Sequence, residues 1–438
     1  MKKNYAFLIL LLSVVSFTAF GQITHITNGA GINWNTTANW DVGTVPGTSA
    51  SDIPQLSHNM TLDVDVTLKS VVFKNRTLSG SNILTLDAKS IESNSDVSNM
   101  SANGTATIEV PVIINNTGTD GTNGGRSKIK ISGGPGRTIT FTSNSSLTVT
   151  TVSELSSGNG NTINVNCNVS GVETLRLSGG SEGTGVVSFT GDNTGFSGSF
   201  QVFSGNIEAN NTVPGGFLSE TATRYQVSGT STLSLNNADI MRANYNIFND
   251  NVLTINVNAN QPSMGNIGFA SGVSATASTS YNIVLGASVA VGFANSSAKE
   301  WGAGKVNITG FTANSVRFGT NANGLTQAQL NAISIDGILY SDNKLSTDGY
   351  LIKGKTLSTK KLDAFKFTMY PNPVKSELAI NSKEPLSSVA VYNLLGKNVL
   401  QATNNLERIS MSSLSTGIYV VKLEAKNGAS VTKRIVKQ

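Results

Sequence analysis

Residues 61–70 read TLDVDVTLKS, and apolar and polar side chains alternate strictly along this stretch. Successive side chains of a β-strand point to opposite faces, so the alternation predicts a strand with one buried face. The positions expected to be buried are Leu62, Val64, Val66 and Leu68. The same period of two returns in short runs along the chain, for example in NVLTINVNAN at 251–260, while helical periodicity is almost absent. The sequence therefore predicts an all-β protein.

The composition of the chain supports this class. Only 13% of the 438 residues are charged, against about a quarter in ordinary globular proteins. The 44 glycines and the many Asn, Ser and Thr residues suit outer faces of hydroxyls and amides and turns built from Gly and Asn. Residues 365–438 hold 10 Lys/Arg and 4 Asp/Glu, a net charge of +6. The rest of the chain holds 21 Lys/Arg and 22 Asp/Glu, a net charge of −1. The basic balance therefore belongs to the tail, and no clustered basic face predicts a nucleic-acid partner.

Two architectures fit such a string of short strands: stacked β-sandwiches and a right-handed β-solenoid. Sandwich domains usually carry a large aromatic core residue each, whereas aromatic residues make up only 7% of this chain. A solenoid buries small aliphatic side chains of each turn against the next, and stacked Asn amides can hydrogen-bond between turns. We therefore predict a long right-handed β-solenoid over residues 22–361, with about 14–17 turns of roughly 20–25 residues. A small C-terminal β-sandwich is expected to follow it.

The ends of the predicted solenoid have signals of their own. Residues 1–21 combine two lysines, an apolar run and small residues near a cleavage point, which predicts a signal peptide. The segment 22–60 is expected to cap the first turn. A short capping helix is expected at 325–334, where Thr326 and Gln329 have the spacing of a capping box. No other long apolar run occurs, so no transmembrane segment is expected in the mature chain.

The only cysteine of the chain, Cys167, excludes an intramolecular disulfide. In the run INVNCNV it shares one face with Ile163, Val165 and Val169. We therefore expect a small buried side chain in a strand.

Three stretches of the middle region resemble secreted β-solenoid passengers. The opening GINWNTTANWDVGTVPGTSASDIPQL at 31–56 is similar to the start of many such passengers. GDNTGFSGSFQVFSGNIEAN at 191–210 is similar to the autotransporter-associated β-strand repeat, and GLTQAQLNAISIDGILYSDNKLSTDGYL at 324–351 resembles a closing segment of those passengers. The resemblance implies a surface β-solenoid and no particular chemistry.

The tail reads as a set of strands of a separate domain. FTMYPNPVKSELAI is followed by VAVYNLLGKNVL and then by LSTGIYVVKLEAKNGASVTKRIVKQ at the terminus. Alternation puts Tyr419, Val421 and Leu423 on one face, and Asn427-Gly428 predicts a tight hairpin turn. The two prolines after Tyr370 should end the first strand.

In this order and at the C-terminus, the three segments closely resemble the type A sorting domain of the type IX secretion system. The resemblance implies an Ig-like β-sandwich over 362–438, a Bacteroidetes-type source, and export to the outer cell surface or the medium. It implies recognition by the type IX translocon and the C-terminal-domain peptidase, cleavage near 362–366, and release or attachment to surface lipopolysaccharide. The sorting-signal residues that it implies are Tyr370, Pro371, Asn372, Pro373, Gly396, Gly417, Tyr419, Lys433 and Lys437.

Few residues of the chain suggest catalysis. The two histidines, His25 and His58, lack partners at metal-ligand spacing, so neither a metal nor another cofactor is predicted. The run 179–183 matches Gly-x-Ser-x-Gly only formally, because no histidine follows it. Asp63 and Asp65 should lie on one outer face as solvated charges, with a glycosidase carboxylate pair as the alternative. The loop around Asp120 lacks calcium-loop spacing, and weak calcium binding is the alternative there.

Glycan contact is the remaining line of interpretation. Trp34 and Trp40 either cover the open first turn or stack on a sugar ring. Outward threonines such as Thr138, Thr140 and Thr142 could form a regular hydroxyl face. The leading hypothesis is a non-enzymatic protein of the cell surface that acts in adhesion or contacts glycans or matrix. The alternative is a polysaccharide lyase or glycoside hydrolase, which would need Asp, Lys or Arg from adjacent turns to meet in one cleft.

Overall fold

The structure is a computed structural model, and it describes residues 25–47, 52–68, 70–87, 97–102, 104–115, 127–131, 134–248, 250–269, 275–356, 366–426 and 430–438. The chain divides into two compact units, Met1–Lys355 and Thr356–Gln438. The expected signal peptide, the Asp120 loop and the Asn427-Gly428 turn lie outside the described residues, as does most of the expected cleavage region. About half of the protein is strand and only 2% is helix, as the alternation of the sequence predicts.

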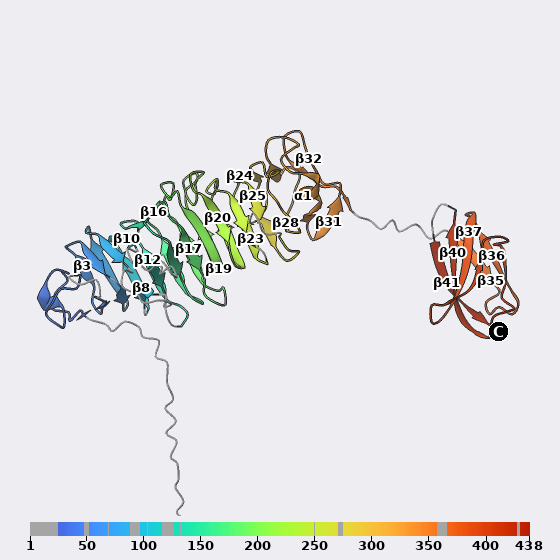
Figure 1. Ribbon diagram of the computed structural model, residues 1–438, viewed down its shortest axis with the longest axis horizontal. Helices are drawn as coiled ribbons and strands as arrows, with labels where there is room; N and C mark the ends of the chain where they lie inside the picture. Colours follow the sequence, from blue (N-terminus) through green and yellow to red (C-terminus); the bar gives the residue numbers. More distant parts are fainter. Residues whose placement is uncertain are drawn as a thin grey trace, which may run out of the picture. The chain divides into compact units, whose positions relative to one another are not determined.

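The first unit is a β-solenoid of about 11 turns (Figure 1). Three parallel sheets run along the stack, and each turn adds a strand to two or three of them. The first face consists of β1 (His25–Ile26), β2 (Pro54–Leu56), β5 (Val71–Phe73), β8 (Val97–Ala102), β11 (Ser127–Lys130), β14 (Ser153–Ser156), β17 (Leu175–Ser178), the start of β19 (Ser199–Ala209), β20 (Arg224–Val227), β22 (Tyr245–Ile247) and β25 (Ile267–Phe269). 

The second face lies one corner further along each turn. Its strands are β3 (Met60–Leu62), β6 (Arg76–Gly80), β9 (Thr105–Ile108), β12 (Thr138–Phe141), β15 (Thr162–Val165), β18 (Val186–Phe189), the end of β19, β21 (Ser231–Leu235), β23 (Val252–Val257), β26 (Ser280–Leu285), β28 (Lys305–Thr309) and β30 (Ile333–Ile335).

The third face is interrupted in the middle of the stack. Its strands are β4 (Val66–Leu68), β7 (Leu84–Asp87), β10 (Pro111–Asn115), β13 (Ser146–Val149) and β16 (Asn168–Gly171), and then β24 (Gln261–Met264), β27 (Val291–Phe293) and β29 (Val316–Phe318). Between the two sets, loops close this side and insert the buried rings of Phe196 and Phe217. In the same region β19 runs without a corner from the first face to the second.

The number of turns is lower than the 14–17 expected from the sequence. Turn length varies widely, because one turn leads from Met60 to Leu78 while another leads from Ile108 to Phe141. Long corner loops show no alternation of apolar and polar residues. The spacing between alternating runs therefore underestimates the mean number of residues in a turn. Both ends of the unit also form caps instead of further turns.

The alternating stretch 61–70 does not form one strand. It divides into β3 and β4, with a corner at Asp63–Asp65. Leu62, Val66 and Leu68 are buried as the alternation predicts, whereas Val64, at the corner, is only partly buried. The run around Cys167 behaves in the same way, since β15 ends at Val165 and β16 begins at Asn168. Cys167 is buried at that corner, which confirms the expected small core residue. Alternation therefore continues through tight corners.

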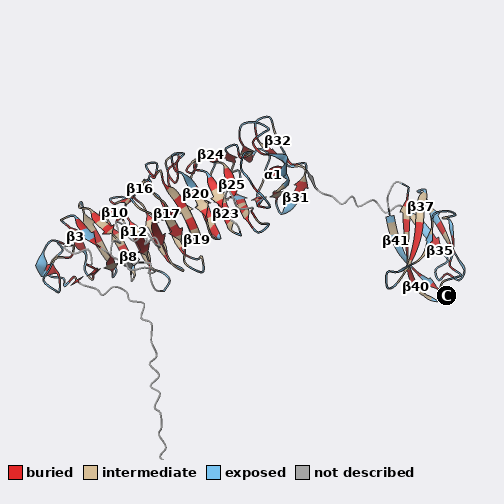
Figure 2. Ribbon diagram, viewed as in Figure 1, coloured by how far each residue is buried: buried red, intermediate tan, exposed pale blue. Residues whose placement is uncertain are grey.

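The interior of the solenoid changes character along the stack. Buried positions follow the strands throughout (Figure 2), and near the N-terminal end they are mostly Leu, Ile and Val. From β18 onward, aromatic rings of successive turns contact one another at centroid distances of 5.2–6.4 Å. The rings in this row are Phe189, Phe200, Phe217, Tyr225, Tyr245, Phe293 and Phe318. Small aliphatic residues were expected there from the sequence, so this aromatic row is a difference from the prediction.

Short elements close the C-terminal end of the solenoid. Helix α1 (Gln327–Asn331) begins with the expected capping box, in which Gln329 N donates to Thr326 Oγ1 at 3.3 Å and Thr326 N to Gln329 Oε1 at 2.7 Å. It is shorter than the predicted 325–334 because β30 begins at Ile333. The strands β31 (Ile338–Ser341), β32 (Lys344–Leu345), β33 (Leu351–Ile352) and β34 (Lys355–Thr356) follow. Because β31 pairs with β30 in antiparallel orientation, it ends the parallel stack.

The second unit is a small antiparallel sandwich. One sheet contains β35 (Phe367–Tyr370), β36 (Glu377–Ser382) and β39 (Arg408–Ser410). The other contains β38 (Asn398–Ala402), β37 (Leu386–Asn393), β40 (Gly417–Ala425) and β41 (Ser430–Lys437). Tyr419, Val421 and Leu423 face its core, as the alternation predicts, together with Leu378 and Ile435.

Candidate functional site

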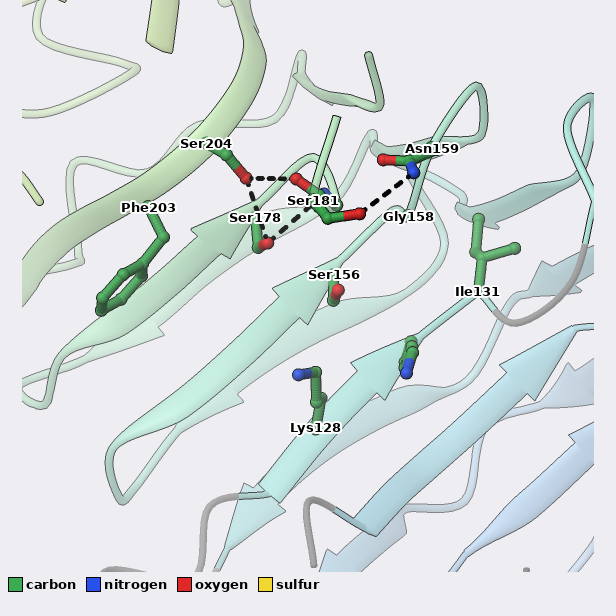
Figure 3. Close-up of a pocket in the computed structure, with 11 residues that line it drawn as sticks. Lys128, Ile131, Ser156, Gly158, Asn159, Ser178, Ser181, Phe203 and Ser204 are labelled. Carbon is green, nitrogen blue, oxygen red and sulfur yellow. Dashed lines mark hydrogen bonds between the residues drawn. The ribbon is translucent and has the colours of Figure 1, made fainter. Parts of the chain in front are cut away.

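A shallow groove of about 760 Å³ lies on the outer side of the first face, over β11, β14, β17 and β19 (Figure 3). We call it the first-face groove. Its bed is a row of side chains that parallel register brings together from four adjacent turns. This row consists of Lys130, Ser156, Ser178 and Ser204. Neighbouring strands of a sheet lie ~4.8 Å apart, so the backbone positions of the three serines and the lysine follow one another along the stack at that spacing.

Two hydroxyls of the bed, those of Ser178 and Ser204, have local hydrogen-bond contacts. Ser204 Oγ donates to the carbonyl of Gly180 at 2.8 Å and lies 3.4 Å from Ser178 Oγ. On the rim, Asn159 Nδ2 donates to Ser181 Oγ at 3.4 Å, and Asn159 Oδ1 accepts from Glu182 N at 3.0 Å. Each Ser retains acceptor capacity toward the groove, since a hydroxyl has one donor and two lone pairs.

The wall of the groove comes from a β-bulge in β19. The register shifts where Leu177 pairs with Val202 and Ser178 with Ser204, which leaves Phe203 as an extra residue on the groove side. The guanidinium carbon of Arg176 lies 5.3 Å from the centroid of the Phe203 ring. The bulge thus adds an aromatic surface to a face that is otherwise polar.

A row of charged side chains runs beside the bed. Lys128, Glu154 and Arg176 occupy equivalent outward positions on β11, β14 and β17. Lys128 Nζ and Glu154 Oε1 lie 2.8 Å apart, and their side chains are only 10% and 8% exposed. Three charged residues from adjacent turns therefore lie side by side next to the groove, and the one carboxylate of this row is bound to a lysine.

The Gly-x-Ser-x-Gly match at 179–183 forms one rim of this groove, and its glycines have a packing role. A Cβ on Gly179 would lie 2.4 Å from the Cα of Gly205 in the next turn. Gly180 and Gly183 adopt positive φ angles of 83° and 66°. The run is a turn between β17 and β18, and no helix follows it, so it is not a nucleophile elbow.

The two tryptophans near the N-terminal end are buried. Trp34 and Trp40 are 0% and 2% exposed and pack edge to face at a centroid distance of 4.9 Å. Trp34 Nε1 donates to Pro46 O at 3.0 Å, and Trp40 Nε1 donates to Trp34 O at 2.9 Å. Neither ring can stack on a sugar, so that alternative is wrong, and both instead cover the first turn.

The histidines and the paired carboxylates near this end stabilise loops. His25 Nε2 lies 3.1 Å from Thr44 Oγ1, and His58 Nδ1 lies 3.1 Å from Thr27 O. Asp63 Oδ1 accepts from Asn35 N at 2.8 Å, and Asp65 Oδ1 accepts from Ile83 N at 2.8 Å. Within the described ranges, His, Cys, Asp and Glu side chains form no group of three that could hold a metal ion.

Thr138 and Thr140 of β12 lie on the outer side of the second face, as expected, whereas the hydroxyl of Thr142, just beyond the strand, is buried. Thr138 is in register with Thr105 and Thr162, and Thr140 is in register with Thr107 and Asn164. The row through Thr138 ends where Val186 follows Thr162, and the row through Thr140 is interrupted by Asn164. Further along this face, Asn258 Nδ2 donates to Asn236 Oδ1 and Asn236 Nδ2 to Asn210 Oδ1, both at 2.7 Å. These bonds confirm the stacked amides predicted from the sequence.

In the second unit, the motif after β35 contacts the last strand. The peptide bonds Tyr370–Pro371 and Asn372–Pro373 are both cis, and β35 ends before them, as the prolines predict. Asn372 Oδ1 accepts from Val436 N at 2.8 Å, and Val374 N donates to Val436 O at 2.8 Å. The motif and the C-terminus of the chain therefore form one structural feature.

Comparison with known families bears on this unit. A family model described as the secretion system C-terminal sorting domain matches residues 368–438. These residues form a type IX secretion sorting domain. No curated protein and no solved structure matches the chain.

The other expected sorting residues lie in one turn and along β40 and β41 of the sorting domain. Gly396 (φ 74°) lies in the turn between β37 and β38, beside the exposed Leu394 and Leu395. Gly417 opens β40, and Tyr419 OH donates to Ser415 O at 2.9 Å, which resembles the tyrosine corner of Ig-like sandwiches. Lys433 Nζ lies 5.8 Å from the centroid of Phe367. Lys437 is buried and pairs with Gly417.

The sorting domain determines where the protein goes. It implies interaction with the type IX secretion machinery and export, with attachment at the cell surface or secretion. Among the residues that the structure describes, no helix is long and apolar enough to span a membrane.

Proposed function

We propose that the solenoid is a non-enzymatic module that contacts glycans or matrix outside the cell through the first-face groove. The observation that carries the proposal is the bed of three in-register hydroxyls beside the Phe203 ring. Sugars are bound by hydroxyl and amide groups that fix orientation and by aromatic rings that cover the apolar side of the ring. An adhesive role also requires retention at the cell surface, which attachment to lipopolysaccharide would provide.

The groove suits a polymer better than a small molecule. It is open and shallow, and its bed runs along the stack, whereas small-molecule sites usually enclose most of the ligand. A chain lying along the stack can contact each turn in the same way. Binding would then increase with the number of sugar units, which is typical of adhesive proteins.

A polysaccharide-degrading enzyme is the second candidate, and one observation favours it. Lys128, Glu154 and Arg176 come from adjacent turns and lie side by side. Glycoside hydrolysis normally needs two carboxylates on either side of the scissile bond. Glu154 is the one carboxylate of this row, and it is bound to Lys128 at 2.8 Å. We therefore rank binding first.

One experiment separates the two candidates. The purified protein is incubated with a panel of soluble polysaccharides, and retention of polymer and release of new sugar ends are measured together. We expect retention without release. Release that disappears in Glu154→Gln would establish the enzyme instead, and absence of both signals for every polymer would refute glycan contact.

A further inference from the structure

The first-face groove has an excess of positive charge. Two lysines, Lys128 and Lys130, line it, and its lining contains no Asp or Glu. Lys128 is paired with Glu154 at the side of the groove. In the described part of the chain, the ammonium of Lys130 has no hydrogen bond or ion pair with another residue. Among the described residues, Lys130 is therefore a positive charge without a paired negative charge, and it lies at the end of the row of serine hydroxyls in the groove.

This charge is unusual for its surroundings. Residues 1–364 hold 21 Lys/Arg and 22 Asp/Glu, so the solenoid has no overall attraction for anions. A cation that lies at the end of a polar bed and faces a groove is a specific anion contact, since an ammonium offers three donors to carboxylate or sulfate oxygens. Phe203 lies on the wall of the same groove and can contact the apolar side of a sugar ring.

We propose that the first-face groove binds an acidic polysaccharide, with the carboxylate or sulfate of one sugar unit on Lys130. The hydroxyls of Ser156, Ser178 and Ser204 contact the neighbouring units along the stack, and Phe203 packs against a ring. This inference rests on the proposed function and specifies its ligand class. Recognition of the acidic group depends on Lys130, whereas the hydroxyls and Phe203 contact neutral and acidic chains alike.

Matched pairs of polymers test the inference. The protein is applied to immobilised polygalacturonate and to its methyl ester, in which a neutral ester replaces each carboxylate, and to dextran sulfate and dextran. We expect the acidic member of at least one pair to be retained about tenfold more strongly, the size of one charged hydrogen bond. The pair that shows the preference identifies the acidic group as a carboxylate or a sulfate.

Two variants assign the preference to the groove. Lys130→Gln should abolish most of the tenfold difference while leaving retention of the neutral polymers unchanged. Lys305→Gln removes the same charge from an exposed position on β28 of the second face and should change nothing. Phe203→Leu should weaken retention of acidic and neutral polymers by the same factor. The thermal unfolding of each variant is recorded to verify folding.

The outcomes separate this inference from the proposed function. Equal retention of both members of each pair would overturn the acidic ligand while leaving glycan contact in place. A preference that Lys130→Gln and Lys305→Gln reduce equally would also overturn it, because general electrostatic attraction would then explain binding. If no polymer is retained, both proposals fail.

Discussion

Tyr225 and Tyr245 show how a single polar atom affects the core of the solenoid. Both rings belong to the interior aromatic row, and neither hydroxyl has a hydrogen-bond partner among the described residues. Burial raises the pKa of both phenols above the ordinary value. Tyr281 differs, since its hydroxyl donates to Gly268 O at 2.6 Å.

Removal of the unpaired hydroxyls should not destabilise the protein. For Tyr225→Phe or Tyr245→Phe we expect an unchanged or higher free energy of unfolding, by up to ~1 kcal/mol, because a buried unsatisfied hydroxyl costs about that much. Tyr281→Phe is the control, and it should lose ~1 kcal/mol because Gly268 O would be left without its donor. Urea unfolding followed by circular dichroism measures all three. A loss at Tyr225 as large as at Tyr281 would show that a partner, such as a buried water, satisfies its hydroxyl.

Burial of Cys167 makes the free energy of unfolding depend on pH. Burial raises the pKa of its thiol from 9.0 to about 12. The unfolded chain therefore ionises at lower pH than the folded one, and this contribution to stability is complete below pH 9 and is lost as the pH rises toward 12. Between pH 8 and 10.5 the loss should be about 2 kcal/mol, at ~1.4 kcal/mol per pKa unit.

Cys167→Ala isolates this effect from other titrations. The variant should have a lower free energy of unfolding at pH 8, since it creates a cavity, but a smaller decline between pH 8 and 10.5 than the unmodified protein. Urea unfolding at the two pH values measures the difference of slopes. Identical declines in the two proteins would contradict a raised thiol pKa.

At the level of elements, the amide ladder of the second face stabilises the stacking of turns. Asn236 donates to Asn210 and accepts from Asn258, so one side chain joins three turns. Asn236→Ala should lower the free energy of unfolding by ~1–2 kcal/mol, since each bond contributes about 0.5–1.5 kcal/mol. Asn206→Ala is a matched control, because Asn206 lies on β19 of the same face and its amide takes part in no such ladder. Equal losses in both variants would argue against a role for the ladder.

Elements were predictable from the sequence where the alternation is strict. Leu62, Val66 and Leu68 are buried as expected, but the corner at Asp63–Asp65 was not foreseen, because corner residues continue to alternate. The first-face groove was missed for a related reason. Lys128, Glu154 and Arg176 are far apart in the sequence, and only the register of β11, β14 and β17 places them side by side.

At the scale of the whole molecule, the export signal could be predicted from the sequence more accurately than the number of solenoid turns. The sorting domain contains local motifs such as Tyr370–Pro373, so it can be recognised from the sequence without knowledge of the fold. The number of turns depends on loop lengths, which carry no periodic signal, and the estimate from the sequence was too high. A solenoid also has two ends whose open edges must be covered, and the sequence shows this as a pair of tryptophans at one end and a capping box at the other.

The N-terminal cap should keep the solenoid monomeric. Trp34 N donates to Thr61 O at 2.9 Å and Thr61 N to Ile32 O at 2.6 Å, so the cap segment occupies the outer edge of β3. Without the buried rings this segment should detach and expose unpaired strand edges, which are prone to join other chains. For Trp34→Ala/Trp40→Ala we therefore expect concentration-dependent association, measured by light scattering. A lower free energy of unfolding is expected as well, by ~3–5 kcal/mol for each indole lost.

Loss of any buried indole destabilises a protein, even where no end of the solenoid is exposed. The predicted association therefore needs a control variant. Trp301 is buried far from the cap, where its ring packs against Phe269 at a centroid distance of 5.9 Å. Trp301→Ala should lower stability by a similar amount and leave the protein monomeric under native conditions. If it associates as strongly as the cap variant, partial unfolding rather than an open edge causes the association. If only the cap variant associates, the tryptophan pair is what stops the parallel stack from adding a second molecule at its first turn.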